Sequence, residues 1–395
     1  MSAVSQREVR CLVLAPFFSH VSSANRPRII AEVLAEFGTV DIVTTSFDHQ
    51  AKKLKVPFQY DDRRTMYYVP TLAYRHNVSL GRFLSHFFFS IRAWIFYLKR
   101  KNKYDVVYAT LPLNLLAMLV FLSCPSKHRI VDVVDIWPDV LPFPVALRKV
   151  LRPFFSVWKQ SFAWAVKHCD MLLTVSDRFF EESYRYFQGD LSDAHRIYIG
   201  CQRIPCKKPP LDDRLTIVYI GNIGHLYDFQ TLLDVLATTP RKVRLFLIGD
   251  GDRKEWLLQE LKTLQIEFQY FGSVYDEKHL SEILSQCDVG FNGYRNTTAA
   301  FSYKANTYFA ASLPILNSMS GDLEHLVVEH GLGFNYSSGS SDSLRTMING
   351  CTKDVLEVCS QNVERFFEAE IELKQVKARL RENFQTTLEC SRDQK

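Results

Sequence analysis

A lysine stands at the point where a loop becomes an apolar helix, in the stretch AAFSYKANTYFAASLP at 299–314. Lys304 precedes the aromatic pair Tyr308-Phe309, so the helix that it opens is expected to be buried. A cation is unfavourable at a helix N-terminus, because the macrodipole is already positive there. It becomes favourable when a polyanion binds, since backbone N–H groups and the lysine then hold one phosphate together. The pattern therefore predicts a phosphate site at Lys304. The alternative is a lysine whose stem extends from the buried helix start to solvent.

Glycine turns follow apolar runs at several places in the second half of the chain. Gly221 and Gly224 lie between a predicted strand and a predicted helix in IVYIGNIGHLYDFQTLLDVL at 217–236. They would let the backbone approach a phosphate closely, although such a turn alone is more often only a tight turn. RLFLIGDGDRKEW at 244–256 repeats the pattern, and FGSV at 271–274 offers main-chain groups that could bracket a flat base. The candidates for the nucleotide base are Gly249, Asp250, Gly272 and Val274.

Carboxylates gather at the end of another apolar run, HRIVDVVDIWPD at 128–139. Period-2 alternation places Asp135 and Asp139 near the end of the predicted strand. A carboxylate there could position or deprotonate an acceptor hydroxyl, or orient a sugar. The equal alternative is a hydrogen-bonded turn in which Asp135 binds backbone groups around Trp137-Pro138.

Each of these residues requires a strand in front of it. Short apolar runs alternate with helical stretches in 1–199, which predicts βαβ crossovers and a parallel sheet. The segment 200–214 has Pro, Gly and charge without periodicity and is predicted to be an interdomain linker. The alternation restarts in 215–358, and the charge-rich end, 359–395, is predicted to be helical, with a return to the first domain as one option. The fold class is therefore α/β, with two doubly wound, Rossmann-like domains whose parallel sheets face each other across a cleft.

The elements expected with explicit bounds are three helices and eleven strands. The helices are placed at 27–38, which is expected to end at Gly38, at 113–123 and at 278–287. The strands are placed at 9–16, 40–46, 104–110, 128–139, 169–176, 215–222, 243–251, 266–274, 288–294, 314–318 and 331–337.

The ordered motifs resemble a known family. Strand–GN–helix, strand–IGDG–helix, strand–FGSV and then CDVGFNGYRNTTAAFSYKANTYFAASLPILNS resemble the donor-binding domain of GT-B-fold nucleotide-sugar glycosyltransferases, in particular glycosyltransferase family 4. YDVVYATLP followed by IVDVVDIWPDVLP is similar to the acceptor-side strand of bacterial surface-polysaccharide transferases, with their Asp-x-Trp-Pro. The resemblance covers nearly the whole chain. It implies catalytic roles for Lys304, which would stabilise the leaving diphosphate, and for Asp135.

The sequence departs from the family pattern on the donor side. The family has two acids eight residues apart where this chain has Ala299 and Thr307, and an Arg and a Lys where it has Asn222 and Tyr227. The resemblance therefore implies that positive charge is concentrated on Lys304, and that Thr307 forms one hydrogen bond in place of the acid. The donor-site candidates are Gly221, Asn222, Gly224, Arg295, Lys304 and Thr307, with His225 and Asn306 as further options.

A polar loop, SHVSSANRPR at 19–28, follows the first predicted strand. In the family this loop contacts the acceptor and, in some members, the diphosphate. The compatible alternative is a capped helix start with Pro27 in the first turn. The acceptor candidates are Ser22, Ser23, Asn25, Arg26 and Asp139.

One segment, SLGRFLSHFFFSIRAWIFYLKRKNK at 79–103, is about long enough to span a bilayer. Arg82, His86 and Arg92 interrupt it, and an arginine near the bilayer centre is costly. An aromatic helix with the basic end Lys99-Arg100-Lys101-Asn102-Lys103 fits an interfacial helix better. The equal alternative is a buried helix whose basic end is merely solvated.

Composition excludes several other classes. The net charge of +5 and the pI of 8.6 fall short of a nucleic-acid-binding domain. The nine cysteines include no C-x-x-C pair, and the N-terminal stretch lacks the form of a signal peptide, so reduced thiols in a cytosolic protein are expected. The sequence contains no P-loop, H-E-x-x-H or nucleophile-elbow motif.

These observations and the resemblance together predict a glycosyltransferase that moves a sugar from a nucleoside diphosphate sugar to a hydroxyl of a lipid-linked or oligosaccharide acceptor in surface-polysaccharide synthesis. The resemblance implies retention of anomeric configuration and no metal or other cofactor, because the nucleotide sugar is a substrate. Partners are anionic lipids at the inner face of the cell membrane, with no nucleic acid. The rivals are a nucleotide-sugar epimerase and a non-catalytic glycan-binding or scaffold protein of the same fold.

Overall fold

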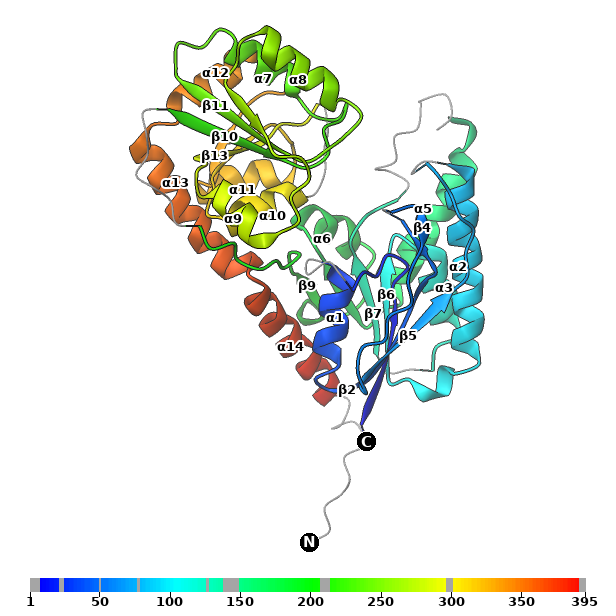
Figure 1. Cartoon of the computed structure of the whole chain (residues 1–395). Helices are drawn as coiled ribbons and strands as arrows, with labels where there is room; N and C mark the ends of the chain where they lie inside the picture. Colours follow the sequence, from blue (N-terminus) through cyan, green and yellow to red (C-terminus); the bar gives the residue numbers. More distant parts are fainter. Residues whose placement is uncertain are drawn as a thin grey trace. The chain divides into compact units, whose positions relative to one another are not determined.

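The computed structural model describes residues 8–20, 25–49, 51–76, 79–125, 128–137, 149–206, 214–295 and 301–390. The chain forms two compact units. Unit 1 comprises Met1–Gly200 together with Val376–Lys395, and unit 2 comprises Cys201–Gln375. Each unit contains one parallel sheet with helices on both faces (Figure 1).

The sheet of unit 1 has seven strands in the order β5-β2-β1-β6-β7-β8-β9, and each pairs in parallel with its neighbours. All six residues of β6 are buried, as expected for a parallel strand covered on both faces. A short antiparallel pair, β3 (Phe47–Asp48) and β4 (Lys53–Leu54), lies outside this sheet. The strands are β1 (Val9–Leu14), β2 (Gly38–Thr45), β5 (Arg64–Val69), β6 (Val106–Leu111), β7 (His128–Val133), β8 (Met171–Thr174) and β9 (Ala194–Arg196).

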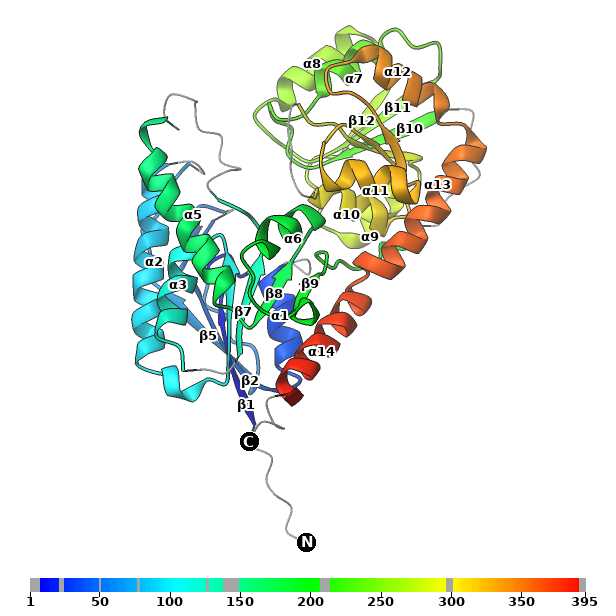
Figure 2. The same cartoon turned by 180° about the vertical axis from the view of Figure 1, so that it is seen from behind.

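Helices α2, α3 and α5 cover one face of this sheet, and α1 covers the other (Figures 1 and 2). Within the described residues, no helix combines the length and the hydropathy that crossing a bilayer requires. The helices are α1 (Arg26–Leu34), α2 (Leu80–Leu98), α3 (Asn114–Leu122), α5 (Arg152–Lys167), α6 (Asp177–Tyr184) and, from Val376 onward, α14 (Leu373–Cys390).

The sheet of unit 2 has six strands in the order β12-β11-β10-β13-β14-β15, again all parallel. The strand order reverses between β10 and β13, and open sheets of this kind bind ligands beyond the carboxyl ends of the strands at that point. The strands are β10 (Leu215–Ile220), β11 (Val243–Ile248), β12 (Phe268–Tyr270), β13 (Val289–Asn292), β14 (Ile315–Asn317) and β15 (Gly333–Asn335).

Helices α7, α8 and α12 lie on one face of this second sheet, and α9, α10 and α11 on the other (Figure 1). The bounds are α7 (Phe229–Leu236), α8 (Lys254–Thr263), α9 (Glu277–Leu284), α10 (Tyr303–Ala310), α11 (Asp322–His330), α12 (Ser341–Gly350) and α13 (Lys353–Phe366). The predicted fold class, two doubly wound α/β units, is therefore confirmed.

Local differences from the expected elements have simple causes. The helix predicted at 27–38 ends at Leu34, and Gly38 begins β2 instead of ending the helix. A Cβ on Gly38 would lie 1.9 Å from the carbonyl oxygen of Val9, so this glycine permits the close pairing of β1 and β2. The edge strands β5 and β9 were not predicted, because β5 is only partly buried and β9 has only three residues.

A buried ion pair joins α1 to the sheet of unit 1. Arg26 is 1% exposed, and its Nε donates to Asp132 Oδ2 at 2.8 Å. The hydroxyl of Tyr108 donates to the same oxygen at 2.6 Å, and Arg26 Nη1 donates to the carbonyl of Tyr198 at 3.5 Å. These contacts fix α1 against the central strands β6 and β7.

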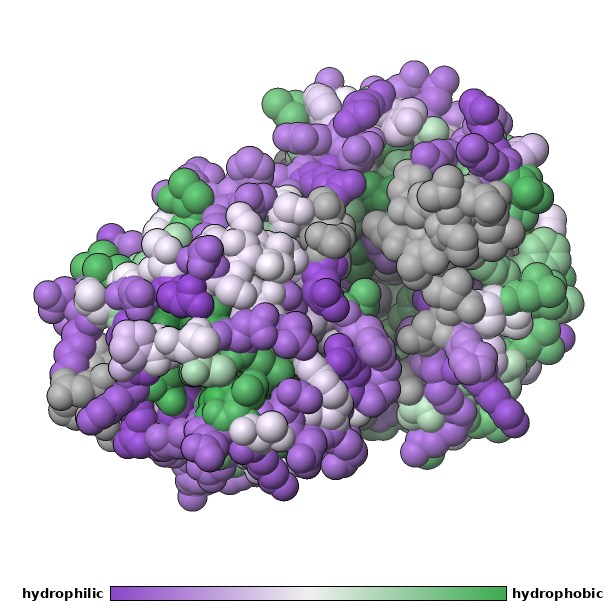
Figure 3. All heavy atoms as spheres, turned by 90° about the horizontal axis from the view of Figure 1, so that it is seen from above, coloured by the Kyte–Doolittle hydropathy of each residue, from purple (hydrophilic) through white to green (hydrophobic). Residues whose placement is uncertain are grey.

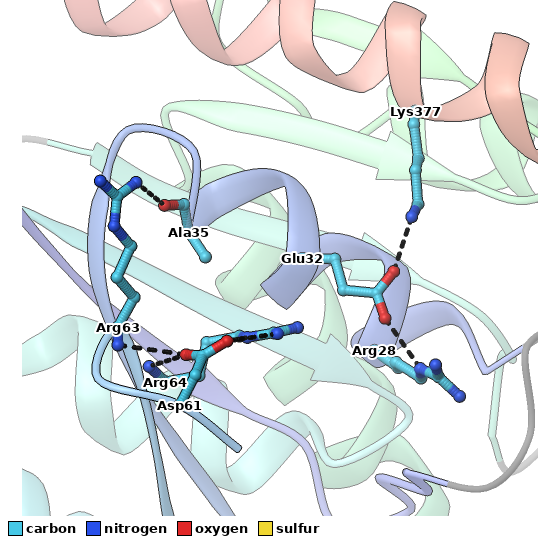
Figure 4. A network of polar contacts seen from close by, with 7 residues as sticks. All are labelled: Arg28, Glu32, Ala35, Asp61, Arg63, Arg64 and Lys377. Carbon is cyan, nitrogen blue, oxygen red and sulfur yellow. Dashed lines mark hydrogen bonds and ion pairs between the residues drawn. The ribbon is translucent and has the colours of Figure 1, made fainter.

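The C-terminal helix α14 is held against α1 by two ion pairs. Glu32 accepts from Lys377 at 2.7 Å and from Arg28 at 2.8 Å (Figure 4). Just after the end of α1, Glu36 pairs with Arg381. Burial acts to raise the pKa of Glu32, but the hydrogen bonds from Lys377 and Arg28 outweigh it and lower that pKa. The last helix therefore belongs to unit 1 through specific side-chain contacts.

Removing the buried carboxylate of Asp132 tests the importance of the ion pair. Asp132→Ala leaves the Arg26 guanidinium buried without its counter-charge, and we expect a loss of about 3–5 kcal/mol in the free energy of unfolding. The control is Asp61→Ala, which breaks a half-exposed pair with Arg64 and should cost less than about 1 kcal/mol. Urea unfolding measures both. Similar small losses in the two variants would contradict the structural role of Arg26.

Candidate active site

The Lys304 side chain crosses the glycine turn that follows β10. Lys304 is the second residue of α10, and its Cδ lies 3.4 Å from the position that a Cβ on Gly221 would occupy. Gly221 has φ of +128°, a conformation that favours glycine, so the turn is both tight and open to the lysine stem. The predicted pair of Gly221 and Lys304 thus lies together at the switch point of the unit 2 sheet.

Three tyrosine rings surround the ammonium group and form what we call the tyrosine cage. Lys304 Nζ lies 3.9 Å from the ring centroid of Tyr227, 4.4 Å from that of Tyr294 and 5.7 Å from that of Tyr219. It donates a hydrogen bond to the Tyr294 hydroxyl at 2.8 Å. These cation–π contacts and the single hydrogen bond are neutral interactions, weaker than an ion pair in the same place.

The cage provides no negative charge. Within the described part of the chain, Lys304 has no carboxylate partner, and burial lowers its pKa to about 7. Burial likewise raises the pKa of Tyr294 to about 12, so the tyrosine hydroxyls stay neutral at physiological pH. The site therefore holds a lysine that is poorly compensated until an anion reaches it.

The cage is held by pairing between the two loops that carry it. Tyr227 and Tyr294 form an antiparallel bridge. Arg295 N–H donates to the carbonyl of Leu226 at 2.9 Å, and Asp228 N–H donates to that of Gly293 at 3.2 Å. The loop after β10 and the segment after β13 are thereby fixed to each other, although about seventy residues separate them in sequence.

The start of α10 lacks the side-chain cap that its sequence offers. Ser302 is the N-cap residue, but its hydroxyl donates to Asn292 Oδ1 at 2.9 Å and does not cap the helix. Asn292 donates in turn to Asn317 Oδ1, and Asn317 to Asn335 Oδ1, both at 2.8 Å, so amides at the ends of β13, β14 and β15 form a ladder. The ladder positions Ser302 away from the helix terminus, which leaves the terminus suited to an anion.

The other predicted donor residues do not contact the Lys304 ammonium directly in the contacts described above. Asn222 and Arg295 are exposed near the cage, and Gly224 is buried in the same turn. Thr307 lies one turn after Lys304, and its hydroxyl donates to the carbonyl of Tyr303 at 3.4 Å. His225 is exposed and 3.8 Å from Asp252, whereas Asn306 is 4% exposed and turned into the unit.

The residues predicted to bracket a nucleotide base lie at the ends of β11 and β12. Gly249 N–H donates to the carbonyl of Gly272 at 2.7 Å, and the Gly249 carbonyl accepts from Tyr270 at 3.0 Å. The main-chain groups of Gly249 are therefore engaged within the protein. Asp250 is exposed and Val274 is partly buried. A hydrogen bond from the backbone of Gly251 and then the contact with Lys254 lower the pKa of Asp250.

In unit 1, Asp135 occupies a turn just after β7. Its Oδ1 accepts from the N–H of Ile136 at 3.0 Å, and its Oδ2 from Trp137 Nε1 at 2.7 Å. This is the hydrogen-bonded turn that was the alternative to a catalytic role. Burial nevertheless raises the pKa of Asp135, which makes the carboxylate a stronger base than an exposed one.

Aromatic and basic side chains that sequence reasoning missed surround this turn. The guanidinium of Arg82 lies 4.5 Å from the Trp137 ring, and the His86 ring stacks on Trp137 at 5.5 Å. Burial, followed by the charges of Arg82 and His49, lowers the pKa of His86 to about 3, so this imidazole is neutral. Both residues lie on α2, and no pattern in the sequence connects them with Asp135.

The predicted acceptor loop is only partly described. Asn25 is the N-cap of α1, accepting from Arg28 N–H at 3.2 Å, as the alternative interpretation of this segment proposed. The expectation that Arg26 contacts an acceptor is corrected, because its side chain is buried against Asp132. Ser22, Ser23 and Asp139 lie outside the described residues.

The tyrosine cage is the feature of the donor side that the sequence did not indicate. Tyr219, Tyr227 and Tyr294 each lie within three residues of a glycine near the end of a predicted strand. That proximity is the one signal in the sequence. It does not show that the three rings converge, because convergence depends on how β10 and β13 pair.

Comparison with known proteins agrees with this geometry. Residues 214–354 match the family model of the glycosyl transferases group 1. No curated protein matches the chain by sequence. Among solved structures, HepE of Anabaena in complex with UDP and glucose is similar at 15% identity and a TM-score of 0.65, covering 96% of this chain and 100% of that one.

Two further solved structures share the architecture. Sucrose-phosphate synthase of Thermosynechococcus elongatus aligns at 14% identity and a TM-score of 0.68, covering 97% of this chain and 100% of that one. WaaG, described as a glycosyltransferase of lipopolysaccharide biosynthesis, aligns at 11% identity and a TM-score of 0.64, covering 94% and 98%. At such identities these likenesses establish the fold alone.

The fold is thus that of the GT-B glycosyltransferases, two Rossmann-like units in tandem. The match to the glycosyl transferases group 1 over 214–354 and this fold together indicate a glycosyltransferase, in agreement with the resemblance found in the sequence.

Replacing the caged lysine tests the cost of burying it. In the folded protein the pKa of Lys304 is about 7, below its usual value of about 10.4, so the unfolded chain binds more protons between these two pH values. Stability should therefore rise with pH over that window in the wild type. Lys304→Met should raise the thermal midpoint most at pH 6, with the gain shrinking towards pH 9. A matched change on an exposed helix, Lys262→Met, should show no such trend. A destabilised Lys304→Met at pH 6 would contradict the argument.

Proposed function

We propose that this glycosyltransferase takes a nucleoside diphosphate sugar as donor and binds its diphosphate between the turn after β10 and the start of α10. The observation that carries the proposal is the Lys304 ammonium, buried among neutral tyrosines at a helix N-terminus that has no side-chain cap. Lysine and main-chain N–H groups together bind phosphate strongly, since both contribute positive charge. The donor-side candidates are Gly221, Asn222, Gly224, Arg295, Lys304 and Thr307, with Asp250 and Val274 on the base side.

The same arrangement supports the chemical step. As the glycosidic bond to the sugar breaks, negative charge increases on the leaving diphosphate. A fixed ammonium and a helix terminus stabilise that charge more in the transition state than in the ground state. Since they supply the positive charge that a divalent ion would otherwise provide, we propose that the reaction needs no metal. HepE, whose solved structures contain UDP and UDP-glucose, makes UDP sugars the first donors to test.

We assign the acceptor to unit 1. Asp135, with a pKa raised by burial, would orient the acceptor hydroxyl or accept its proton. Ser22, Ser23, Asn25 and Asp139 are the further acceptor candidates. By the family resemblance, residues 1–199 form the acceptor domain, 215–358 the donor domain, 200–214 their linker, and 359–395 a C-terminal helical segment. The proposed acceptor is a lipid-linked glycan of a surface polysaccharide, the proposed outcome is retention of configuration, and the proposed location is the inner face of the cell membrane.

Nucleotide binding is the first test. Calorimetry with UDP, GDP, TDP and CMP should find one diphosphate that binds, and Lys304→Ala should weaken its affinity roughly 10- to 100-fold, because one charge-assisted contact is lost. Lys262→Ala on α8 makes the same change of charge at an exposed position and should leave binding unchanged. If no nucleotide binds to the wild type, the proposal fails and a non-catalytic glycan-binding role becomes the better account.

The affinity should also depend on pH in a direction set by the lysine. Because burial lowers the pKa of Lys304 to about 7, the free site loses its positive charge above that pH, whereas a bound diphosphate would hold the proton. We expect the diphosphate affinity to fall up to about tenfold per pH unit from 7 to 9, with proton uptake on binding. Lys304→Arg keeps its charge over this range and should abolish the fall. Calorimetry in buffers of different ionisation enthalpy measures the proton uptake, and a flat profile in the wild type would contradict a neutral lysine in the free site.

A further inference from the structure

Helix α2 exposes several large apolar side chains on the side away from the domain core. The residues that it buries include small and polar ones, and those that it exposes are large and apolar. The buried set is Ser85, His86, Phe89, Ser90, Ala93 and Tyr97. The exposed apolar set is Leu80, Leu84, Phe87, Phe88 and Ile95, at 74%, 41%, 50%, 39% and 43% exposure. An ordinary surface helix has the opposite arrangement.

These exposed residues form one stripe. Their spacing follows the helical repeat, so they share a face along nearly the whole length of α2. At 1.5 Å per residue, the stripe from Leu80 to Ile95 is about 22 Å long. A stripe of this length lying along a helix surface fits an interface parallel to the helix axis.

Helix α5 widens the stripe into a surface. Phe154 and Val157 on α5 are 54% and 66% exposed, and Val150, just before the helix, is 76% exposed. The rings of Phe83 on α2 and Phe154 on α5 lie 6.4 Å apart, so the two helices touch where both expose apolar residues. We call this surface the α2–α5 apolar face. Hydrophobic side chains gather at the right-hand edge of the view from above in Figure 3, the side on which Figure 1 shows α2 and α5.

Within the described residues, the charged side chains that α2 and α5 themselves carry are all positive. Neither α2 nor α5 contains an Asp or a Glu, although the chain has 43 of them. Exposed cations flank the apolar residues on both helices and directly after them. They are Arg92, Lys99, Lys103, Lys149, Arg152 and Lys159. An apolar face edged only by cations is complementary to an anionic lipid surface.

We propose that the α2–α5 apolar face docks in the plane of an anionic bilayer, with Leu84, Phe87 and Phe88 inserted among the lipids. This surface is the one through which unit 1 would reach a lipid-linked acceptor. Membrane docking itself does not depend on the proposed function, but its role in bringing the enzyme to such an acceptor does. His86 and Arg82, on the inner side of the same helix, contact Trp137 beside Asp135. Docking through α2 would therefore bring the bilayer to the helix that supports the proposed acceptor turn.

A second copy of the chain is a weaker occupant for the same face. Two copies related by a twofold axis would bring like-charged rims together, and such juxtaposition opposes association. An anionic bilayer attracts the same cations. The positive charge around the α2–α5 apolar face therefore favours an anionic bilayer over a second copy of the chain.

Vesicle flotation of the full-length protein tests the proposal. The vesicles are phosphatidylcholine alone and phosphatidylcholine with about 30% phosphatidylglycerol, a composition that supplies the negative surface potential. The test variant is Leu84→Gln/Phe87→Ser/Phe88→Ser, whose side chains are already exposed, so the fold should persist. We expect the wild type to float with anionic vesicles and the variant to partition at least about tenfold less.

A matched control separates docking from general loss of surface hydrophobicity. Val328 and Val358, on α11 and α13 of unit 2, are 76% and 56% exposed, and Val328→Ser/Val358→Ser should float like the wild type. Charge reversal at Lys99, Arg100, Lys101 and Lys103 should lower binding to anionic vesicles and leave the weaker binding to neutral vesicles unchanged, since only the electrostatic part is removed.

Three outcomes would overturn the proposal. They are no flotation of the wild type, flotation of the apolar-face variant equal to the wild type, and a concentration-dependent dimer that the variant abolishes while vesicles fail to bind. The last result would assign the face to a second copy. Calorimetry with the same nucleotides on the same proteins keeps the two proposals distinct. Intact nucleotide binding without flotation overturns docking alone, and flotation without nucleotide binding overturns the proposed function alone.

Discussion

Burial of a lysine ammonium without a carboxylate partner is the constraint that organises unit 2. The Lys304 stem needs a glycine beneath it, its head needs electron-rich rings around it, and α10 must begin where the stem can reach both. The ladder of Asn292, Asn317 and Asn335 meets the last requirement, because it draws Ser302 towards the strand ends. The neutral partners compensate the cation poorly, so an anion bound at the proposed donor site would stabilise it.

Unit 1 has the opposite electrostatic arrangement. Its buried cation, Arg26, is paired with Asp132, and that pair stabilises the contact between α1 and the sheet. Its uncompensated features lie on the surface instead, where α2 and α5 expose apolar residues and cations together. A charge buried with its partner stabilises a fold, whereas a charge or an apolar surface left without one indicates a place for a ligand or partner.

The structural features that could be predicted from the sequence are those that depend on short-range patterns of apolar and polar residues. Strands buried on both faces, such as VVYATL in β6, read as continuous apolar runs, so the central strands and the fold class followed from them. The edge strand β5, RTMYYV, is only partly buried, so its sequence lacks a continuous apolar run and did not predict a strand. Lys304 stood out because a cation at a helix start is unusual, but the cage depends on two loops about seventy residues apart. Whether the Arg26 side chain points to solvent or into the core depends on how α1 is rotated about its axis. The polar loop before the helix does not determine that rotation.

The absence of an acid three residues after Lys304 takes on a physical meaning in this geometry. Side chains three apart share a helix face, so a carboxylate at that position could pair with the ammonium and raise its pKa. Thr307 stands there instead, with its hydroxyl turned back to the helix carbonyl of Tyr303. The lysine therefore has no internal competitor for a phosphate, and the neutral cage leaves it to the ligand to supply the negative charge. In the proposed donor site, the departure from the family pattern at Thr307 thus leaves Lys304 without a carboxylate on its own helix face.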